Sequence, residues 1–105
     1  MLNRLTIMGR MVRDPELRYS ANEKPVVNFT LAVERDRDRE QTDFIDCVAW
    51  NGTAEFVSKY FRKGSMCIVS GRLQMRKYEA KDGTNRTAYE VVCDNVYFGE
   101  SKKGD

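Results

Sequence analysis

The chain has 105 residues, enough for one domain with a single hydrophobic core and too few for two. A hydrophobic content of 41%, a charged content of 32% and a net charge of +2 describe a soluble globular protein and exclude a polycationic tail. Any basic binding surface must therefore arise from local clustering. No apolar run approaches about 18 residues and no signal peptide follows Met1, so we expect a cytoplasmic protein that does not enter a membrane.

Alternation of apolar and polar residues predicts the first two strands, over residues 2–12 and 26–34. Turn chemistry follows the first strand at 13–16, and a short segment at 17–19 precedes another break at 20–24. The second strand carries apolar side chains at every other position, which is typical of a strand that buries one face.

The run from Glu34 to Glu40 alternates in sign and has two interpretations. Mixed-sign runs are commonly solvated loops whose charges compensate one another. If the strand instead continues outward as an arm, Arg35, Arg37 and Arg39 share one face and form a mobile basic finger.

A third strand is predicted over residues 43–50, with alternate residues facing the core and Phe44 and Trp50 on the outer face. Exposed aromatic clusters favour aggregation unless they bind something, so binding or burial at a subunit contact is expected there. Helical spacing of apolar residues then predicts a helix over 52–63, capped by Asn51 or Thr53 and ended by Gly64.

The fourth predicted strand, residues 65–78, contains the stretch Gly71-Arg72-Leu73-Gln74-Met75-Arg76-Lys77-Tyr78. Strand alternation assigns Leu73 and Met75 to the core and places Arg72, Gln74, Arg76 and Tyr78 on the opposite face. An aromatic ring beside two guanidinium groups suits a nucleic acid strand, because bases stack on the ring and phosphates pair with the cations.

Asp82-Gly83 predicts a type I′ hairpin turn that leads into a fifth strand over 86–98. Five strands with one α-helix between the third and the fourth are the order of an OB-fold, an all-β, partly open barrel. We therefore expect one OB-fold domain over residues 1–99 and a short disordered end over 100–105.

Histidine is absent, which removes the commonest general base and the Ser/His and Cys/His nucleophiles. Cys47, Cys67 and Cys93 lie in apolar segments without CxxC spacing, so we predict small buried hydrophobic residues rather than a metal site. The sequence thus indicates no cofactor, no metal and no enzymatic activity.

Several motifs together resemble the bacterial and phage single-stranded DNA-binding protein (SSB) family over about residues 1–98. They are Gly9-Arg10, Asp14-Pro15-Glu16-Leu17-Arg18-Tyr19, Thr30-Leu31-Ala32-Val33, Arg62-Lys63-Gly64-Ser65, Gly71-Arg72-Leu73 and Arg76-Lys77-Tyr78. The resemblance implies an OB-fold homotetramer whose first strands pair between subunits. It also implies sequence-independent binding and protection of single-stranded DNA in replication, recombination and repair.

The resemblance assigns base stacking to Phe44, Trp50 and Tyr78, each an aromatic of a different kind from the commonest one in the family. Arg37 falls where many relatives carry a further stacking aromatic, in an arm that is several residues shorter here. The predicted phosphate contacts are Arg72, Arg76, Lys77, Arg37 and Lys63. Further candidates, which could equally serve subunit contacts, are Arg4, Arg10 and Arg18.

Cellular members of this family continue into a flexible tail with an acidic tip that recruits other enzymes, whereas this sequence stops at Asp105. That ending corresponds either to a core separated from its tail or to a tailless member from a phage or mobile element. We therefore do not expect recruitment through such a tip.

Two other functions remain open from the residues alone. One is an OB-fold that binds protein partners, as a primosome-type module, more than DNA. The other is a small barrel enzyme with metal-dependent chemistry, for which the candidate carboxylates are Asp43, Asp46, Asp82 and Asp94.

Overall fold

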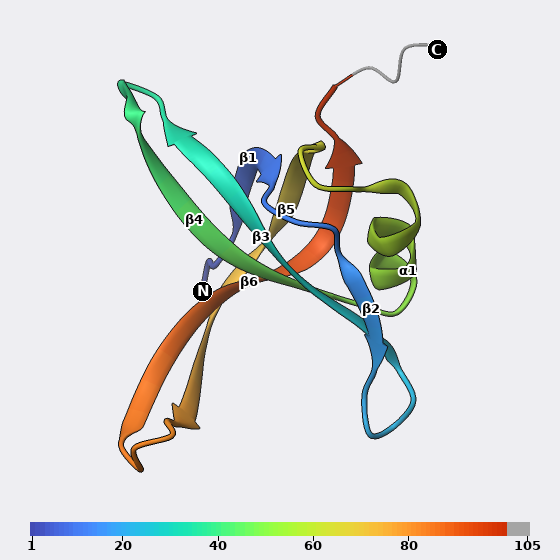
Figure 1. The fold of residues 1–105 in the computed structure, drawn as a ribbon, viewed down its shortest axis with the longest axis vertical. Coiled ribbons are helices and arrows are strands. Elements are labelled where there is room, and N and C mark those ends of the chain that lie inside the picture. Colours follow the sequence, from blue (N-terminus) through green and yellow to red (C-terminus); the bar gives the residue numbers. More distant parts are fainter. Residues whose placement is uncertain (101–105) are drawn as a thin grey trace.

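The computed structural model describes residues 1–100, and Figure 1 shows their arrangement. The elements are β1 (Leu5–Met11), β2 (Glu16–Tyr19), β3 (Pro25–Arg35), β4 (Asp38–Trp50), α1 (Asn51–Tyr60), β5 (Met66–Glu79) and β6 (Asn85–Phe98). The predicted disordered end over 100–105 falls, from residue 101 onward, outside the described residues.

The strands form one sheet in the order β1-β5-β6-β4-β3-β2, and a further pairing of β1 with β3 closes it into a barrel. All neighbouring pairs are antiparallel except β4 and β6, which run parallel where Cys47 and Val48 face Val91 and Val92. A mostly β structure with a closed five-stranded barrel and one helix agrees with the predicted OB-fold.

The position of the helix in the strand order needs a correction, because residues 17–19 belong to a strand. β2 is only four residues long, and it pairs with β3 between Glu16↔Asn28 and Tyr19↔Pro25. The helix therefore follows the fourth strand rather than the third. A strand this short has too few residues to show alternation, and its pairing with β3 is what makes it a strand.

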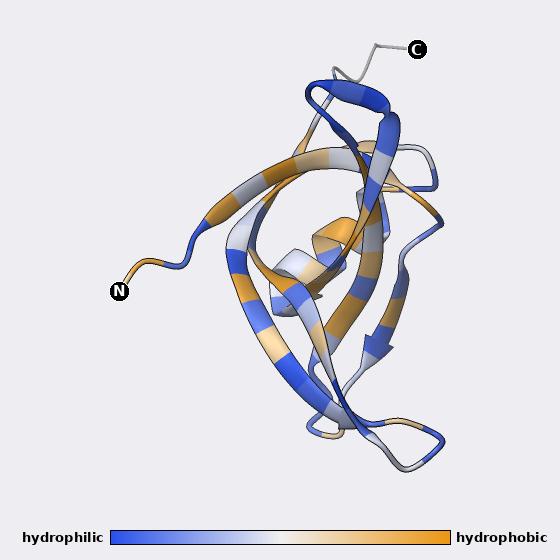
Figure 2. Ribbon diagram, turned by 90° about the vertical axis from the view of Figure 1, so that its left-hand side faces the viewer, coloured by the Kyte–Doolittle hydropathy of each residue, from blue (hydrophilic) through white to orange (hydrophobic). Residues whose placement is uncertain are grey.

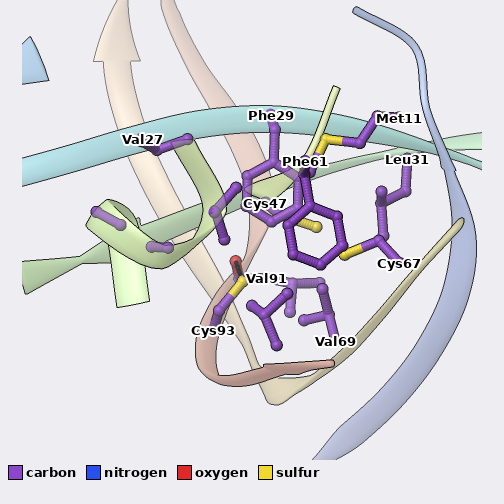
Figure 3. Close-up of a cluster of buried hydrophobic side chains, with 14 residues drawn as sticks. Met11, Val27, Phe29, Leu31, Cys47, Phe61, Cys67, Val69, Val91 and Cys93 are labelled. Carbon is purple, nitrogen blue, oxygen red and sulfur yellow. Dashed lines mark hydrogen bonds between the residues drawn. The ribbon is translucent and has the colours of Figure 1, made fainter. Parts of the chain in front are cut away.

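The barrel interior is filled by apolar side chains from β1, β3, β4, β5 and β6 and from the helix (Figure 3). Cys47, Cys67 and Cys93 are free and buried, as the sequence predicted. Burial raises the pKa of the Cys67 thiol to about 12, and the interaction with the Cys93 thiol, together with burial, raises the pKa of Cys47. Cys47 and Cys67 therefore act as packing groups rather than as nucleophiles.

Helix α1 is shorter than the predicted 52–63 and is capped differently. It begins after Trp50 without a side-chain cap, and Asn51 has a φ of 56°. It ends at Tyr60, because Phe61 has an extended backbone and directs its ring into the core. Arg62 then donates a hydrogen bond of 2.8 Å from Nη1 to the Ser58 carbonyl, as expected for a cation at the negative end of a helix.

Figure 2 shows the alternation of apolar and polar residues along the strands, with α1 lying across one end of the barrel. Contacts of the helix with β3, β4 and β6 agree with this position. No helix among residues 1–100 is long and apolar enough to cross a membrane.

Two hairpins, β3–β4 and β5–β6, extend beyond the barrel as diverging arms, the first toward the upper left and the second toward the lower left of Figure 1. Leu73 and Met75 were predicted in the core but lie in the β5–β6 arm and are 45% and 50% exposed. The pairing of β4 with β6 is confined to two residue pairs, so the arm leaves the sheet and has no second layer to cover it. Leu73 and Met75 alternate as the residues of a core strand do, but the hydrophobic core ends before this part of β5.

The turn of the β5–β6 arm also differs from the prediction. Only Gly83 has a positive φ, of 84°, whereas a type I′ turn requires positive φ at both central residues. Gly83 N–H donates to the Ala80 carbonyl and Ala80 N–H to the Thr84 carbonyl, which closes a three-residue loop with a glycine in the left-handed region. The Asp82 carboxylate accepts hydrogen bonds from the Thr84 backbone and hydroxyl, and these lower the pKa of Asp82.

The charged run forms the tip of the β3–β4 arm, where Asp36 and Arg37 make the turn. Arg35 does not share a free basic face with Arg37 and Arg39, because it donates two hydrogen bonds to the Asp43 carboxylate, at 3.0 and 3.2 Å. This contact lowers the pKa of Asp43 and raises that of Arg35. The arm is thus partly charge-compensated at its base and carries an exposed arginine at its tip.

Candidate nucleic-acid interface

The predicted site residues of β4 and β5, with the exception of Lys77, belong to one outer face of the sheet. The register places Val26 beside Trp50 and Asn28 beside Val48, and Val48 faces Val92 across the parallel pair. Val92 in turn pairs with Arg72 on β5. Side chains at the same level of adjacent strands point to the same face, so a continuous surface runs from β3 across β4 and β6 to β5.

Three aromatic rings stand out from this surface. Phe44, Trp50 and Tyr78 are 68%, 41% and 40% exposed, although large apolar groups are usually buried. Phe44 and Trp50 lie on the same side of β4, six residues and therefore about 20 Å apart along the strand. Rings that project singly along a path provide separate stacking platforms for successive bases.

The β5–β6 arm adds cations to the same face. Arg76 holds its guanidinium carbon 5.3 Å from the centroid of the Tyr78 ring. Its Nε lies 3.8 Å from a carboxylate oxygen of Glu90 on β6. Arg72, four residues earlier, makes no salt bridge among residues 1–100 and is exposed. The arm thus presents a ring with an adjacent guanidinium and a second, unpaired guanidinium nearer the barrel.

Three predicted phosphate contacts are not brought together with these residues. Lys77 alternates to the opposite face of the arm, together with Met75. Lys63 precedes β5 and donates its backbone N–H to Asp14, whereas Tyr78 lies at the far end of this strand of about 40 Å. Arg37 lies at the tip of the β3–β4 arm, which points away from the β5–β6 arm (Figure 1).

The structure places Arg18, one of the further candidates, on this surface, and it places the exposed ring of Tyr89 on the opposite face. Arg18 pairs with Val26, which pairs with Trp50, so the guanidinium of β2 lies on the same face two strands away. Tyr89 is exposed as well, but it pairs with Met75 and therefore lies on the face of the arm opposite Arg76 and Tyr78. Both depend on sheet register, because neither β2 nor the departure of the arm is visible in the alternation of residues.

Among residues 1–100, no three side chains of the types that hold metal ions gather at one place. The described structure thus adds no candidate metal centre to the aromatic and basic surface.

The amino-acid sequence of the chain matches a known protein family. Residues 2–99 match the single-strand binding protein family. The chain belongs to this family. Membership agrees with the prediction of a binding protein rather than an enzyme.

Individual relatives cover nearly the whole chain. It is 46% identical to the single-stranded DNA-binding protein of Oceanobacillus iheyensis, over 97% of this chain and 66% of that protein. It is 43% identical to the protein of the same name from Fusobacterium nucleatum, over 96% of this chain and 69% of that one. Single-stranded DNA-binding protein A of Bacillus subtilis is 44% identical, over 99% and 63% respectively. The chain therefore spans about two thirds of the length of these relatives.

Proposed function

We propose that the chain binds single-stranded DNA without catalysis and largely independently of sequence, and so protects it during replication, recombination and repair. Residues 1–99 are the proposed binding domain. The observation that carries the proposal is the row of exposed rings, Phe44, Trp50 and Tyr78, on one face with Arg72 and Arg76. The names of its relatives support the same conclusion.

The proposed mechanism combines stacking with phosphate neutralisation. Every base has a π-face, so stacking on Phe44, Trp50 and Tyr78 tolerates any sequence and contributes roughly 1–3 kcal/mol per base. Arginine contacts with phosphates release counterions, which makes the affinity depend on salt concentration. Because Arg37, Lys63 and Lys77 lie apart from the central surface, we propose that they contact the strand where it enters, leaves or wraps around the domain.

The direct test is a fluorescence titration with oligo-dT of several lengths at two salt concentrations. Trp50 is the single tryptophan, so its emission reports on one proposed stacking position. We expect strong quenching, a defined site size and weaker binding at the higher salt concentration. A chain that neither binds the oligonucleotides nor shows quenching would contradict the proposed function, and salt-insensitive binding would favour a protein-interaction module.

Replacing Arg72 with glutamine tests the phosphate neutralisation in the proposed mechanism. Arg72 has no salt bridge within the described chain, so its loss leaves no carboxylate unpaired. We expect the slope of log K against log salt to become shallower by about 0.7 for each subunit whose Arg72 contacts the strand. Lys59→Gln is the matched control. It also removes one positive charge, but from helix α1, where Lys59 lies beside the Tyr60 ring. Equal slopes in the two variants would refute the Arg72 contact.

We also propose that the chain assembles as a homotetramer. One edge of β1 pairs with β5 from Leu5 to Arg10, but the other edge pairs with β3 only at Arg10 and Met11. An unpaired strand edge is a template for a second strand, here the β1 of another subunit. An apolar row on the outer face, formed by Met8, Ile68 and Tyr97 at one register level, supports a second contact.

A Met8→Glu variant should assemble into a smaller oligomer, because a charge would be buried in the proposed apolar contact. Sedimentation velocity at matched protein concentrations measures the change. Met75→Glu is the control, since Met8 and Met75 are 52% and 50% exposed and only Met8 lies in the apolar row. If both variants sediment as the parent does, the Met8 face is not a subunit contact.

A further inference from the structure

Asn51 is followed by Gly52 at the junction of β4 and α1, directly after Trp50. This is the only Asn-Gly pair in the sequence. We propose that the Asn51 side chain is a site of spontaneous deamidation, and that the aspartate or isoaspartate formed there weakens the binding of single-stranded DNA. The effect on binding rests on the proposed function, because it assumes that Trp50 contacts the strand.

The reaction needs only water as a co-reactant. Hydroxide removes the proton of the Gly52 N–H, and the nitrogen attacks the side-chain carbonyl carbon, Cγ, of Asn51. A bond forms between the Gly52 nitrogen and Cγ, the bond between Cγ and Nδ2 breaks, and ammonia leaves with a proton from water. Water then opens the five-membered imide ring at one of its two carbonyl carbons. The net reaction consumes one water, releases one ammonia and leaves a carboxyl group where the amide was.

The structure leaves the reacting groups accessible. Asn51 and Gly52 are both exposed. The Gly52 N–H has no acceptor among residues 1–100, because the first amides of a helix lack an intrahelical partner and no side chain caps α1. A Cβ atom at Gly52 would meet no atom within 4 Å, so the space beside the attacking nitrogen is open. The nitrogen therefore loses no hydrogen bond when it attacks.

Asn51 also has a simpler role, which is to turn the chain from β4 into α1. Its φ of 56° lies in the left-handed region, which asparagine adopts more readily than most residues with a Cβ atom. This role does not explain Gly52, which has no positive φ and an open Cβ position. Glycine also lowers helix stability relative to alanine. The fold thus requires the left-handed residue but not the glycine that makes its amide reactive.

The product places a negative charge next to the proposed interface. Trp50 is 41% exposed, and a carboxylate on the following residue repels the phosphates of a strand that stacks on its ring. The same carboxylate lies at the N-terminus of α1, where a negative charge is favourable. Aspartate at this position should therefore weaken DNA binding without destabilising the fold. Isoaspartate has the same charge and in addition lengthens the backbone between β4 and α1 by one methylene group.

The first measurement follows the reaction itself. The folded parent is incubated at pH 9 and at pH 6, and peptide mapping by mass spectrometry follows each asparagine over time. We expect the mass gain of an NH₂ to OH change at Asn51 first, faster at pH 9, with isoaspartate among the products. Asn22 is the internal control, because it is exposed in the turn after β2 but precedes Glu23. No mass gain at Asn51, or an equally fast gain at Asn22, would overturn the inference.

The second measurement tests the effect on binding. Asn51→Asp reproduces one product and should raise the Kd for oligo-dT by about fivefold, as expected for one close repulsion in water, while Tm stays at the parent value. Lys59→Gln makes the same change in net charge in the last turn of α1 and should bind as the parent does. Asn51→Gly keeps the left-handed backbone without an amide, so its affinity should not fall during incubation, whereas that of the parent should.

The outcomes separate this inference from the proposed function. If Asn51→Asp binds oligo-dT as tightly as the parent, deamidation has no effect on binding and the inference is wrong, although the proposed function stands. An equal loss of affinity in Asn51→Gly during incubation would also overturn it, because that variant cannot deamidate at this position. Failure of the fresh parent to bind oligo-dT would instead contradict the proposed function, and the mass gain at Asn51 would be judged on its own.

Discussion

Replacing Trp50 with alanine is expected to raise the Kd for oligo-dT by about 5- to 150-fold, which corresponds to the loss of one stacked base. Trp50 is the largest ring of the proposed interface, and it lies on β4 between Phe44 and the start of the helix. The slope of log K against log salt should stay nearly unchanged, since no cation is removed. Anisotropy of a labelled oligonucleotide measures both quantities, because the variant has no tryptophan fluorescence.

Two further variants make the Trp50 result specific. Trp50→Phe keeps a π-face and should recover most of the lost affinity. Tyr19→Ala removes an exposed ring from β2, where Tyr19 pairs with Pro25 and so alternates to the face opposite Trp50. This control should bind as the parent does. If Trp50→Ala retained the parent affinity, the stacking role of Trp50 would be wrong.

Replacing Gly71 with alanine is expected to lower the free energy of unfolding by about 3 kcal/mol, at the upper end of the cost of overpacking. A Cβ atom there would lie 2.1 Å from the carbonyl oxygen of Val92, which is a backbone atom with little freedom to move. Gly71 also lies at the register shift between β5 and β6, where the arm begins to leave the barrel. Relief of the clash would therefore require the two strands to separate at the base of the arm.

Thermal unfolding at equal protein concentration measures the effect of the Gly71 substitution, because assembly makes stability depend on concentration. For a chain of this size we expect Tm to fall by more than about 10 °C. Gly52→Ala is the control, since a Cβ at Gly52 meets no atom within 4 Å and alanine favours helix. Equal Tm values for the two variants would mean that β5 and β6 can accommodate the methyl group.

Most of the barrel could be predicted from the alternation of residues. Val27, Phe29 and Leu31 are buried at every other position of β3, and Cys47 and Ala49 continue the same core on β4. Alternation works there because one face of each strand meets the interior and the other does not. Alternation fails at β2, which is too short to show a period. The spacing of apolar residues also predicts Phe61 in the helix, whereas its backbone is extended.

The candidate site could be predicted in its residue types but only partly in its arrangement. Phe44, Trp50 and Tyr78 attract attention because they are large rings at outward positions of strands, and the structure confirms that they are exposed. The separation of Arg37 from the central surface depends on the direction of the β3–β4 arm, and that of Lys63 on the length of β5. Both are properties of the assembled sheet.

The sequence by itself determined the strand alternation, the buried cysteines and the chemical character of the outer face, because each depends on a residue and its neighbours along the chain. Only the tertiary structure decided that Leu73 and Met75 are exposed and that Arg18 joins the face of Trp50. The physical reason is that these outcomes depend on which strands pair and where the pairing stops. The two residue pairs that join β4 to β6 mark that limit, and beyond them β6 continues with β5 alone in the arm that leaves the barrel.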